Sequence, residues 1–235
     1  MKQICAALAC LLFVGFDQVA ARETTFIAAD RIRVERYLAS PPAEGSPAHQ
    51  AELAELRRIE ATRAPADIAA AKSDGDDKSV FLFRNVFGEK FAKENLPALD
   101  ALASRLAEDE DAAIDRAKEE FARRRPYKVD TSLHPVCRTG AKDDSYPSGH
   151  AALGYVLALT LIDIAPERRD ELLERADKYA RNRLVCGVHH PSDVAAGRLA
   201  AYAIHGAVAL DPRYLVEVAA ARSELRRTLG QARAD

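Results

Sequence analysis

The segment 151–164 constrains the fold most strongly, because it is apolar almost throughout and its first strongly polar residue is Asp163. A helix that is apolar on every side must be surrounded by other elements, and this one is too short to span a membrane. The segment 194–210 has a similar character but contains Arg198 and His205. Both segments are therefore predicted to be central helices of a bundle.

Most of the remaining chain repeats its apolar residues at helical spacing, and no alternating run is long enough to indicate a sheet. The expected helices cover 50–63, 65–74, one or two helices within 96–125, then 148–164, 167–185, 191–209 and 212–228. A chain of 235 residues with 48% hydrophobic and 30% charged residues suits one core. We therefore predict an all-α, single-domain helical bundle.

The segment from Tyr127 to Tyr146 interrupts this helical pattern. It contains Pro135, Gly140 and several short polar residues, which favour irregular structure. Connections of this length are uncommon in a compact domain unless they have a function. The sequence therefore predicts a long loop that contributes to a functional site.

Residues 1–21 are expected to be a secretory signal, and residues 22–235 the mature domain. A lysine comes second, an apolar stretch runs from about Ile4 to Phe16, and small residues end the segment at Ala21. A lipoprotein signal at Cys10 is not favoured, because this cysteine lies inside the apolar stretch instead of after it. We expect export to the periplasm, or secretion, with no membrane-spanning segment after the signal.

The formal net charge is −2, and the signal removes one lysine and one aspartate, so no basic surface for nucleic acid is expected. Removal of the signal leaves Cys137 and Cys186. In an oxidising compartment these two cysteines could form a disulfide, but Cys186 could equally be a small buried residue in its apolar surroundings. The apolar helices also leave enough surface for a homodimer.

The first polar motif is KEEFARRRP, at 118–126. Lys118 and Arg125 are seven residues apart, so two helical turns are predicted to place them on one face. Pro126 is predicted to end this helix, because a proline disfavours the α conformation in the residue before it. The two cations could bind an anion together, or could be solvated beside the negative end of the helix dipole.

The second motif is PSGH, at the start of the apolar helix. Ser148 can cap the helix, and Gly149 allows a ligand to approach the free amides of the first turn, which bind anions. His150 would lie beside such an anion. The positive helix end disfavours an imidazolium there, so a purely stabilising role is unexpected. The alternative is a capping serine with an incidental histidine.

The third motif is RNRLVCGVHHPSD, in which Arg183 precedes His189 by six residues and Asp193 follows it by four. Pro191 suits the first position of a helix, which places His189 just before that helix and Asp193 in its first turn. The carboxylate can then accept a hydrogen bond from one imidazole nitrogen and leave the other as a nucleophile. Alternatively, Asp193 stabilises the helix start, and His189 and His190 are polar loop residues.

A metal site at the two adjacent histidines and Asp193 is not favoured. Adjacent side chains point in different directions, and the chain has no HExxH motif or cysteine-rich ligand set. We expect no metal and no other cofactor.

Together the motifs supply cations, helix-start amides, a serine and two histidines. Phosphoryl transfer needs positive donors for the equatorial oxygens, an in-line nucleophile and an acid for the leaving oxygen. Arginine suits the oxygens because its planar fork donates two parallel hydrogen bonds. The inventory therefore favours a phosphoryl site over the separate alternatives.

The ordered set K-x6-R-P at 118–126, P-S-G-H at 147–150 and R-x5-H-x3-D at 183–193 resembles the signature of the type-2 phosphatidic acid phosphatase and vanadium haloperoxidase superfamily. Its length and its PPAEGS segment make the chain similar to the bacterial class A non-specific acid phosphatases. This resemblance implies an exported acid phosphatase acting on small phosphate esters. The alternatives are a lipid phosphate or diphosphate phosphatase, a haloperoxidase and a non-catalytic phosphate-binding helical protein.

The resemblance also implies roles for individual residues. His189 would attack phosphorus to form a phosphohistidine, Asp193 would orient it, and His150 would protonate the leaving alcohol and then activate water. The spacing from Arg183 and Asp193 selects His189 over His190. The phosphoryl oxygens would be held without a metal by Lys118, Arg125, Ser148, the Gly149 amide and Arg183. Asn182 stands where the family usually has serine, and we expect it to tune binding.

Overall fold

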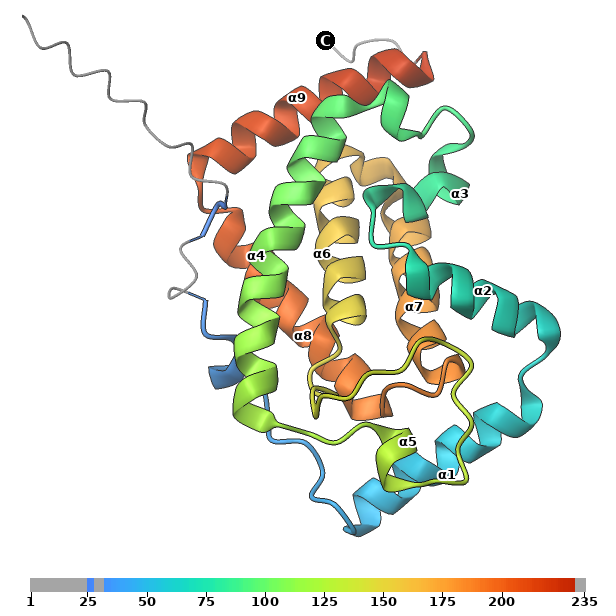
Figure 1. Cartoon of the computed structure of the whole chain (residues 1–235). Coiled ribbons are helices and arrows are strands. Elements are labelled where there is room, and N and C mark those ends of the chain that lie inside the picture. The colour runs from blue at the N-terminus through green and yellow to red at the C-terminus, as the bar shows by residue number, and fades with distance from the viewer. Residues whose placement is uncertain (1–24, 28–31, 231–235) are drawn as a thin grey trace, which may run out of the picture.

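The computed structural model describes residues 25–27 and 32–230, and the predicted signal lies outside these ranges (Figure 1). Within the described ranges the chain forms helices and loops and no strand, which confirms the all-α fold class. The α-helices are α1 (Pro47–Thr62), α2 (Pro65–Asp76), α3 (Arg84–Phe87), α4 (Pro97–Phe121), α5 (Pro126–Val129), α6 (Gly149–Ile164), α7 (Arg169–Val185), α8 (Pro191–Val208) and α9 (Pro212–Leu229). Short 3₁₀ helices cover Val34–Arg36, Val80–Phe83, Lys93–Asn95 and Pro166–Arg168.

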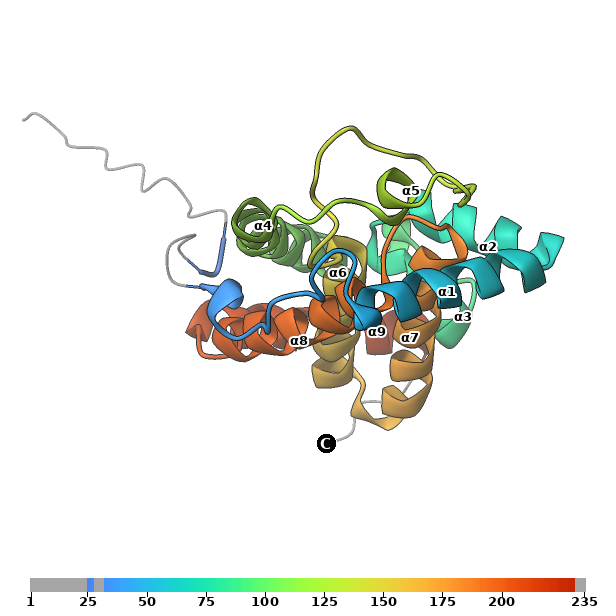
Figure 2. The same cartoon turned by 90° about the horizontal axis from the view of Figure 1, so that it is seen from below.

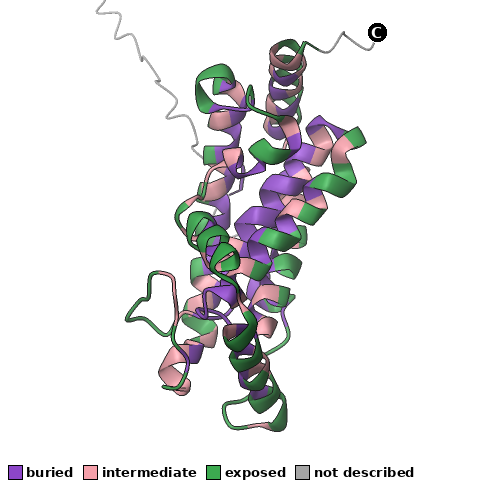
Figure 3. Ribbon diagram, turned by 90° about the vertical axis from the view of Figure 1, so that its right-hand side faces the viewer, coloured by how far each residue is buried: buried purple, intermediate pink, exposed green. Residues whose placement is uncertain are grey.

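Helix α6 is the centre of the bundle, as its apolar sequence predicts. It contacts α4, α7, α8 and α9, and every residue from Ala151 to Ala158 is buried. In Figure 3 the buried residues follow the helix faces that turn toward the interior. No helix in the described part of the chain is long and apolar enough to cross a bilayer.

Close packing of α8 against the start of α6 depends on Gly197. A Cβ atom at this position would lie 2.4 Å from the Ser148 carbonyl oxygen and 2.9 Å from the Ala151 Cβ. Both distances are shorter than side chains tolerate, so a larger residue would push the two helices apart. Because Gly197 has no side chain, α8 can pack directly against the first turn of α6.

The structure corrects the prediction that Lys118 and Arg125 share one helix face. Helix α4 ends at Phe121, because Ala122 adopts a left-handed conformation with φ of 43° and turns the chain out of the helix. Arg125 lies beyond this turn, directly before α5. Pro126 therefore begins a helix instead of ending one.

The loop that follows α5 is tied to the end of α7 by a disulfide. Cys137 and Cys186 are bonded, so the disulfide interpretation holds, although Cys186 is also fully buried. The Val136 amide donates a hydrogen bond to the Cys186 carbonyl oxygen beside the bridge. The predicted long loop is thus anchored to α7 near its middle.

Replacing Cys137 and Cys186 together by serine is expected to lower the free energy of unfolding by about 3 kcal/mol, because the bridge closes a long loop in the unfolded chain. The two cysteines are 49 residues apart in the sequence. Urea denaturation of both proteins measures the difference, and wild-type protein under a reducing agent should behave like the double variant. Equal unfolding free energies would contradict this prediction.

Candidate active site

Three segments that are far apart in the sequence meet at the lower end of the bundle in Figure 1, which Figure 2 views from below. Helix α4 carries Lys118 in its last turn, and Arg125 follows before α5. Helix α6 begins here with Ser148 as its cap, and α7 ends here with Arg183 in its last turn. The turn between α7 and α8 contributes His189. The tertiary structure therefore gathers cations and a histidine around the start of α6.

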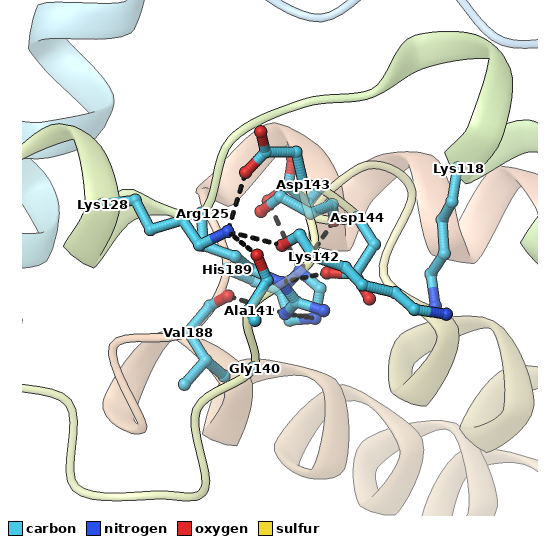
Figure 4. A network of polar contacts seen from close by, with 12 residues as sticks. Lys118, Arg125, Lys128, Gly140, Ala141, Lys142, Asp143, Asp144, Val188 and His189 are labelled. Atoms are coloured by element: carbon cyan, nitrogen blue, oxygen red, sulfur yellow. Dashed lines mark hydrogen bonds and ion pairs between the residues drawn. The ribbon is translucent and has the colours of Figure 1, made fainter.

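The His189 ring is buried, and its two nitrogens have different partners (Figure 4). Nδ1 lies 2.8 Å from the Ser145 carbonyl oxygen and 3.4 Å from Asp193 Oδ2, so it donates a hydrogen bond to these acceptors. Nε2 then has a lone pair, which accepts a hydrogen bond from Arg125 Nη1 at 2.9 Å. The contacts therefore favour the tautomer that a nucleophile at Nε2 requires.

Burial, followed by the charge of Arg125, lowers the pKa of His189 to about 3, although Asp193 acts in the opposite direction. The imidazole is therefore neutral at any mildly acidic pH when no anion is bound beside it. A neutral ring keeps its Nε2 lone pair available for attack under conditions in which an ordinary histidine is protonated.

Asp193 is fully buried and held from several sides. Its Oδ1 accepts a hydrogen bond from Arg123 Nη1 at 2.6 Å, and its Oδ2 accepts from Ser145 Oγ at 2.6 Å and from the His190 amide at 2.7 Å. Burial would raise the pKa of Asp193, but hydrogen bonds with His189 and His190 outweigh it and bring the pKa well below its usual range. The predicted contact with His189 is present but long, so Ser145 shares the orientation of that ring.

The sequence analysis missed Arg123 and Glu52. Arg123 bridges Asp193 and Glu52, with its Nη2 at 2.7 Å from Glu52 Oε2. Glu52 Oε1 accepts a hydrogen bond from the Ser192 amide at 2.7 Å, which links α1 to the start of α8. Arg123 lies within a run of three arginines, and nothing in that run indicates which one is buried.

His190 contacts the same Asp193 oxygen as His189, but its ring has different neighbours. Its Nδ1 lies 3.2 Å from Asp193 Oδ2, and its ring lies 5.4 Å from that of His49. Its Nε2 is buried and has no hydrogen-bond partner among the described residues. His190 therefore does not face Arg125, which distinguishes it from His189.

His150 lies in the first turn of α6, as predicted. Its Nε2 donates a hydrogen bond to the Gly75 carbonyl oxygen of α2 at 3.1 Å, and its ring stacks on Tyr179. Burial, then the positive charge of Arg183, lowers the pKa of His150 to about 2. The ring is therefore neutral at neutral and mildly acidic pH when no anion is bound beside it.

Arg183 is buried, and its Nε has no hydrogen-bond partner among the described residues. Burial lowers the pKa of Arg183 to about 10, so the side chain remains cationic at neutral and acidic pH. Gly75 leaves room for it, since a Cβ there would lie 3.0 Å from Arg183 Nη1. A buried guanidinium with an unused donor is suited to binding an anion.

Ser148 caps α6 by accepting a hydrogen bond from the Ala151 amide at 3.4 Å, in agreement with the sequence analysis. A Cβ at Gly149 would lie 3.5 Å from Lys118 Nζ and 3.6 Å from Glu110 Oε1, so both side chains adjoin the first turn of α6. Burial raises the pKa of Glu110 well above its usual range, which favours the protonated form of its carboxyl group. Sequence reasoning missed Glu110, because it stands in an acidic run typical of a solvated helix face.

The Asn182 side chain is hydrogen-bonded to α2 and not to the cations or histidines around the start of α6. Its Nδ2 donates a hydrogen bond to Asp74 Oδ2 at 2.7 Å, and Asp74 also forms an ion pair with Arg175. Asn182 thus links α7 to α2. Among the described residues, no group of three or more histidine, cysteine, aspartate or glutamate side chains is arranged to hold a metal ion.

Residues 110–217, which include the last turns of α4 and the starts of α6 and α8, match the PAP2 superfamily. An acid phosphatase of Zymomonas mobilis is 32% identical over 199 residues, which cover 81% of this chain and 75% of the relative. A non-specific acid phosphatase of Salmonella typhimurium is 30% identical over 205 residues, covering 83% and 81% of the two chains. The chain belongs to the non-specific acid phosphatases of the PAP2 superfamily and is a phosphoric monoester hydrolase.

The fold is also similar to that of a bacterial vanadium-dependent iodoperoxidase. The two structures align with a TM-score of 0.56 at 19% sequence identity, over 74% of this chain and 52% of the other. The chain thus spans about half the length of that peroxidase. At this identity the similarity concerns the arrangement of helices alone.

Proposed function

We propose that this protein is an exported acid phosphatase that hydrolyses small phosphate monoesters through a phosphohistidine on His189, without a metal. The observation that carries the proposal is the state of His189, whose Nδ1 donates to Ser145 and whose neutral Nε2 is directed at Arg125. The export and the periplasmic location rest on the predicted signal at residues 1–21.

In this proposal the phosphoryl group binds between the His189 Nε2 and the surrounding cations. Lys118, Arg125 and Arg183 donate to its oxygens, as do the Ser148 hydroxyl and the Gly149 amide, which lies at the positive end of the α6 dipole. The unpartnered Nε of Arg183 supports this arrangement. Substrate must also replace the hydrogen bond between Arg125 and His189, because the same lone pair attacks phosphorus.

Attack forms the bond between His189 Nε2 and phosphorus while the bond to the leaving oxygen breaks. The ring becomes positively charged, and the buried Asp193 carboxylate stabilises it. His150 gives its proton to the leaving alcohol. In the second step His150 accepts a proton from water, the resulting hydroxide attacks phosphorus, and His189 is released with orthophosphate.

A bound phosphoryl group makes His150 suitable as an acid. In the substrate-free enzyme its pKa of about 2 reflects burial and the charge of Arg183. Phosphate oxygens beside the ring offset that charge and raise the pKa. The ring can then take up a second proton from solvent, and the resulting imidazolium donates a proton to the leaving oxygen and returns to the neutral form.

Hydrolysis of p-nitrophenyl phosphate is expected to be fastest at acid pH and to be unaffected by EDTA. On the acidic side, kcat/KM should fall only as the pH approaches the His189 pKa of about 3, because neutral His189 is the nucleophile. On the alkaline side kcat should fall as the enzyme–substrate complex loses the proton that His150 donates. Rates measured between about pH 4 and about pH 9, with and without EDTA, test this. Loss of activity with the chelator, or no activity at any pH, would contradict the proposal.

A further inference from the structure

The loop before α6 places a carboxylate among the cations of the proposed phosphate site. Asp144 Oδ1 accepts a hydrogen bond from Arg125 Nε at 2.9 Å, and its side chain is 29% exposed. Figure 4 shows this contact next to His189, with Lys118 approaching from α4. Asp144 therefore lies where an anionic substrate is expected to bind, although none of the three sequence motifs includes it.

Two cations from separate segments lower the pKa of Asp144. Burial would raise this pKa, but the hydrogen bond with Arg125 and its charge, followed by the charge of Lys118, lower it overall. The carboxylate is therefore ionised at neutral pH and at mildly acidic pH. Lys118 itself forms an ion pair with Asp115 at 3.6 Å, on the exposed side of α4.

The Nε and Nη1 donors of Arg125 are already engaged in the substrate-free protein. Nε donates to Asp144, and Nη1 donates both to the Val188 carbonyl oxygen and to His189 Nε2. A phosphoryl group that accepts two parallel hydrogen bonds from a guanidinium needs one of its edges. Each edge includes Nε or Nη1, so such binding must compete with Asp144 or His189.

We propose that Asp144 is a specificity-determining residue, an internal anion that competes with the phosphoryl group for Arg125 and disfavours phosphate dianions relative to monoanions. The inference rests on the proposed function, because it assumes that Arg125 binds the phosphoryl group. Repulsion by a fixed carboxylate increases with the charge of the ligand. Asp144 therefore weakens the binding of product orthophosphate and shifts the preference toward the monoanionic esters that predominate at acid pH.

The neighbouring residue offers a matched control. Asp143 has the same charge and lies in the same loop, but it forms an ion pair with Lys128 Nζ at 2.8 Å. An asparagine at either position removes one carboxylate from the loop. Only the substitution at position 144 removes the carboxylate that is paired with Arg125.

The test compares inhibition by orthophosphate in wild type, Asp144→Asn and Asp143→Asn, with direct binding measured by calorimetry. At about pH 8, where the dianion predominates, Asp144→Asn should lower both Ki and Kd for orthophosphate by about tenfold. At about pH 5, where the monoanion predominates, the decrease should be smaller. Asp143→Asn should change neither constant.

A residue that only positions Arg125 would give the opposite sign, because its loss would weaken phosphate binding at both pH values. Weaker or unchanged binding in Asp144→Asn, or an equal gain in Asp143→Asn, would overturn the inference. Asp144→Ser is a second variant that removes the charge and keeps a small polar side chain. Failure of the wild type to hydrolyse any phosphate monoester would instead overturn the proposed function, so the two results are distinguishable.

Discussion

Replacing His189 by alanine is expected to abolish hydrolysis, with kcat reduced by about four orders of magnitude or more. The change removes the side chain that bonds to phosphorus in the proposed mechanism, whereas the cations that bind phosphate remain. The variant should therefore still bind orthophosphate. Steady-state rates with p-nitrophenyl phosphate and calorimetry with orthophosphate measure the two effects separately.

His190→Gln is the matched control for this experiment. His190 is buried against Asp193, and glutamine keeps a donor near that carboxylate while removing the imidazole. This variant should retain measurable turnover. Rapid quenching in alkali, in which a phosphohistidine is stable, should trap a labelled phosphoenzyme in wild type and in His190→Gln but not in His189→Ala. An inactive His190→Gln beside an active His189→Ala would mean that the wrong histidine was chosen.

Replacing Arg123 by alanine is expected to lower the free energy of unfolding by about 3 to 5 kcal/mol, because it leaves the buried Asp193 carboxylate without its ion-pair partner. Arg123 contacts Asp193 at 2.6 Å, and its side chain is 7% exposed. The loss should also lower kcat, since Asp193 would no longer be held beside His189. Urea denaturation and steady-state kinetics measure both effects.

The adjacent Arg124 provides the control, because its partner Glu44 is exposed. Arg124→Ala should change the unfolding free energy by about 1 kcal/mol at most. The pKa of Asp193 is lower in the folded protein than in the unfolded chain, so the stabilisation is present above the unfolded pKa and declines as the pH falls below about 4. The difference between wild type and Arg123→Ala should therefore shrink in that range. Equal effects of Arg123→Ala and Arg124→Ala would contradict the prediction.

Much of the fold follows from local patterns. The apolar run 151–164 predicted the central helix, and Ser148 and Pro191 marked the starts of α6 and α8 correctly. These features depend on side-chain spacing and on capping within a few residues, which the sequence contains directly. The end of α4 was placed wrongly, because the left-handed turn at Ala122 has no local signal such as glycine.

The sequence by itself determined the three motifs and the types of group that they contribute, because those depend on residue identity and order. Only the tertiary structure decided which charged residues act together. Arg123 and Glu110 stand in runs that are typical of solvated helix faces, and Asp144 stands in a loop whose path no local pattern specifies. Their roles depend on burial and on partners more than a dozen residues away, and these arise only when the helices pack.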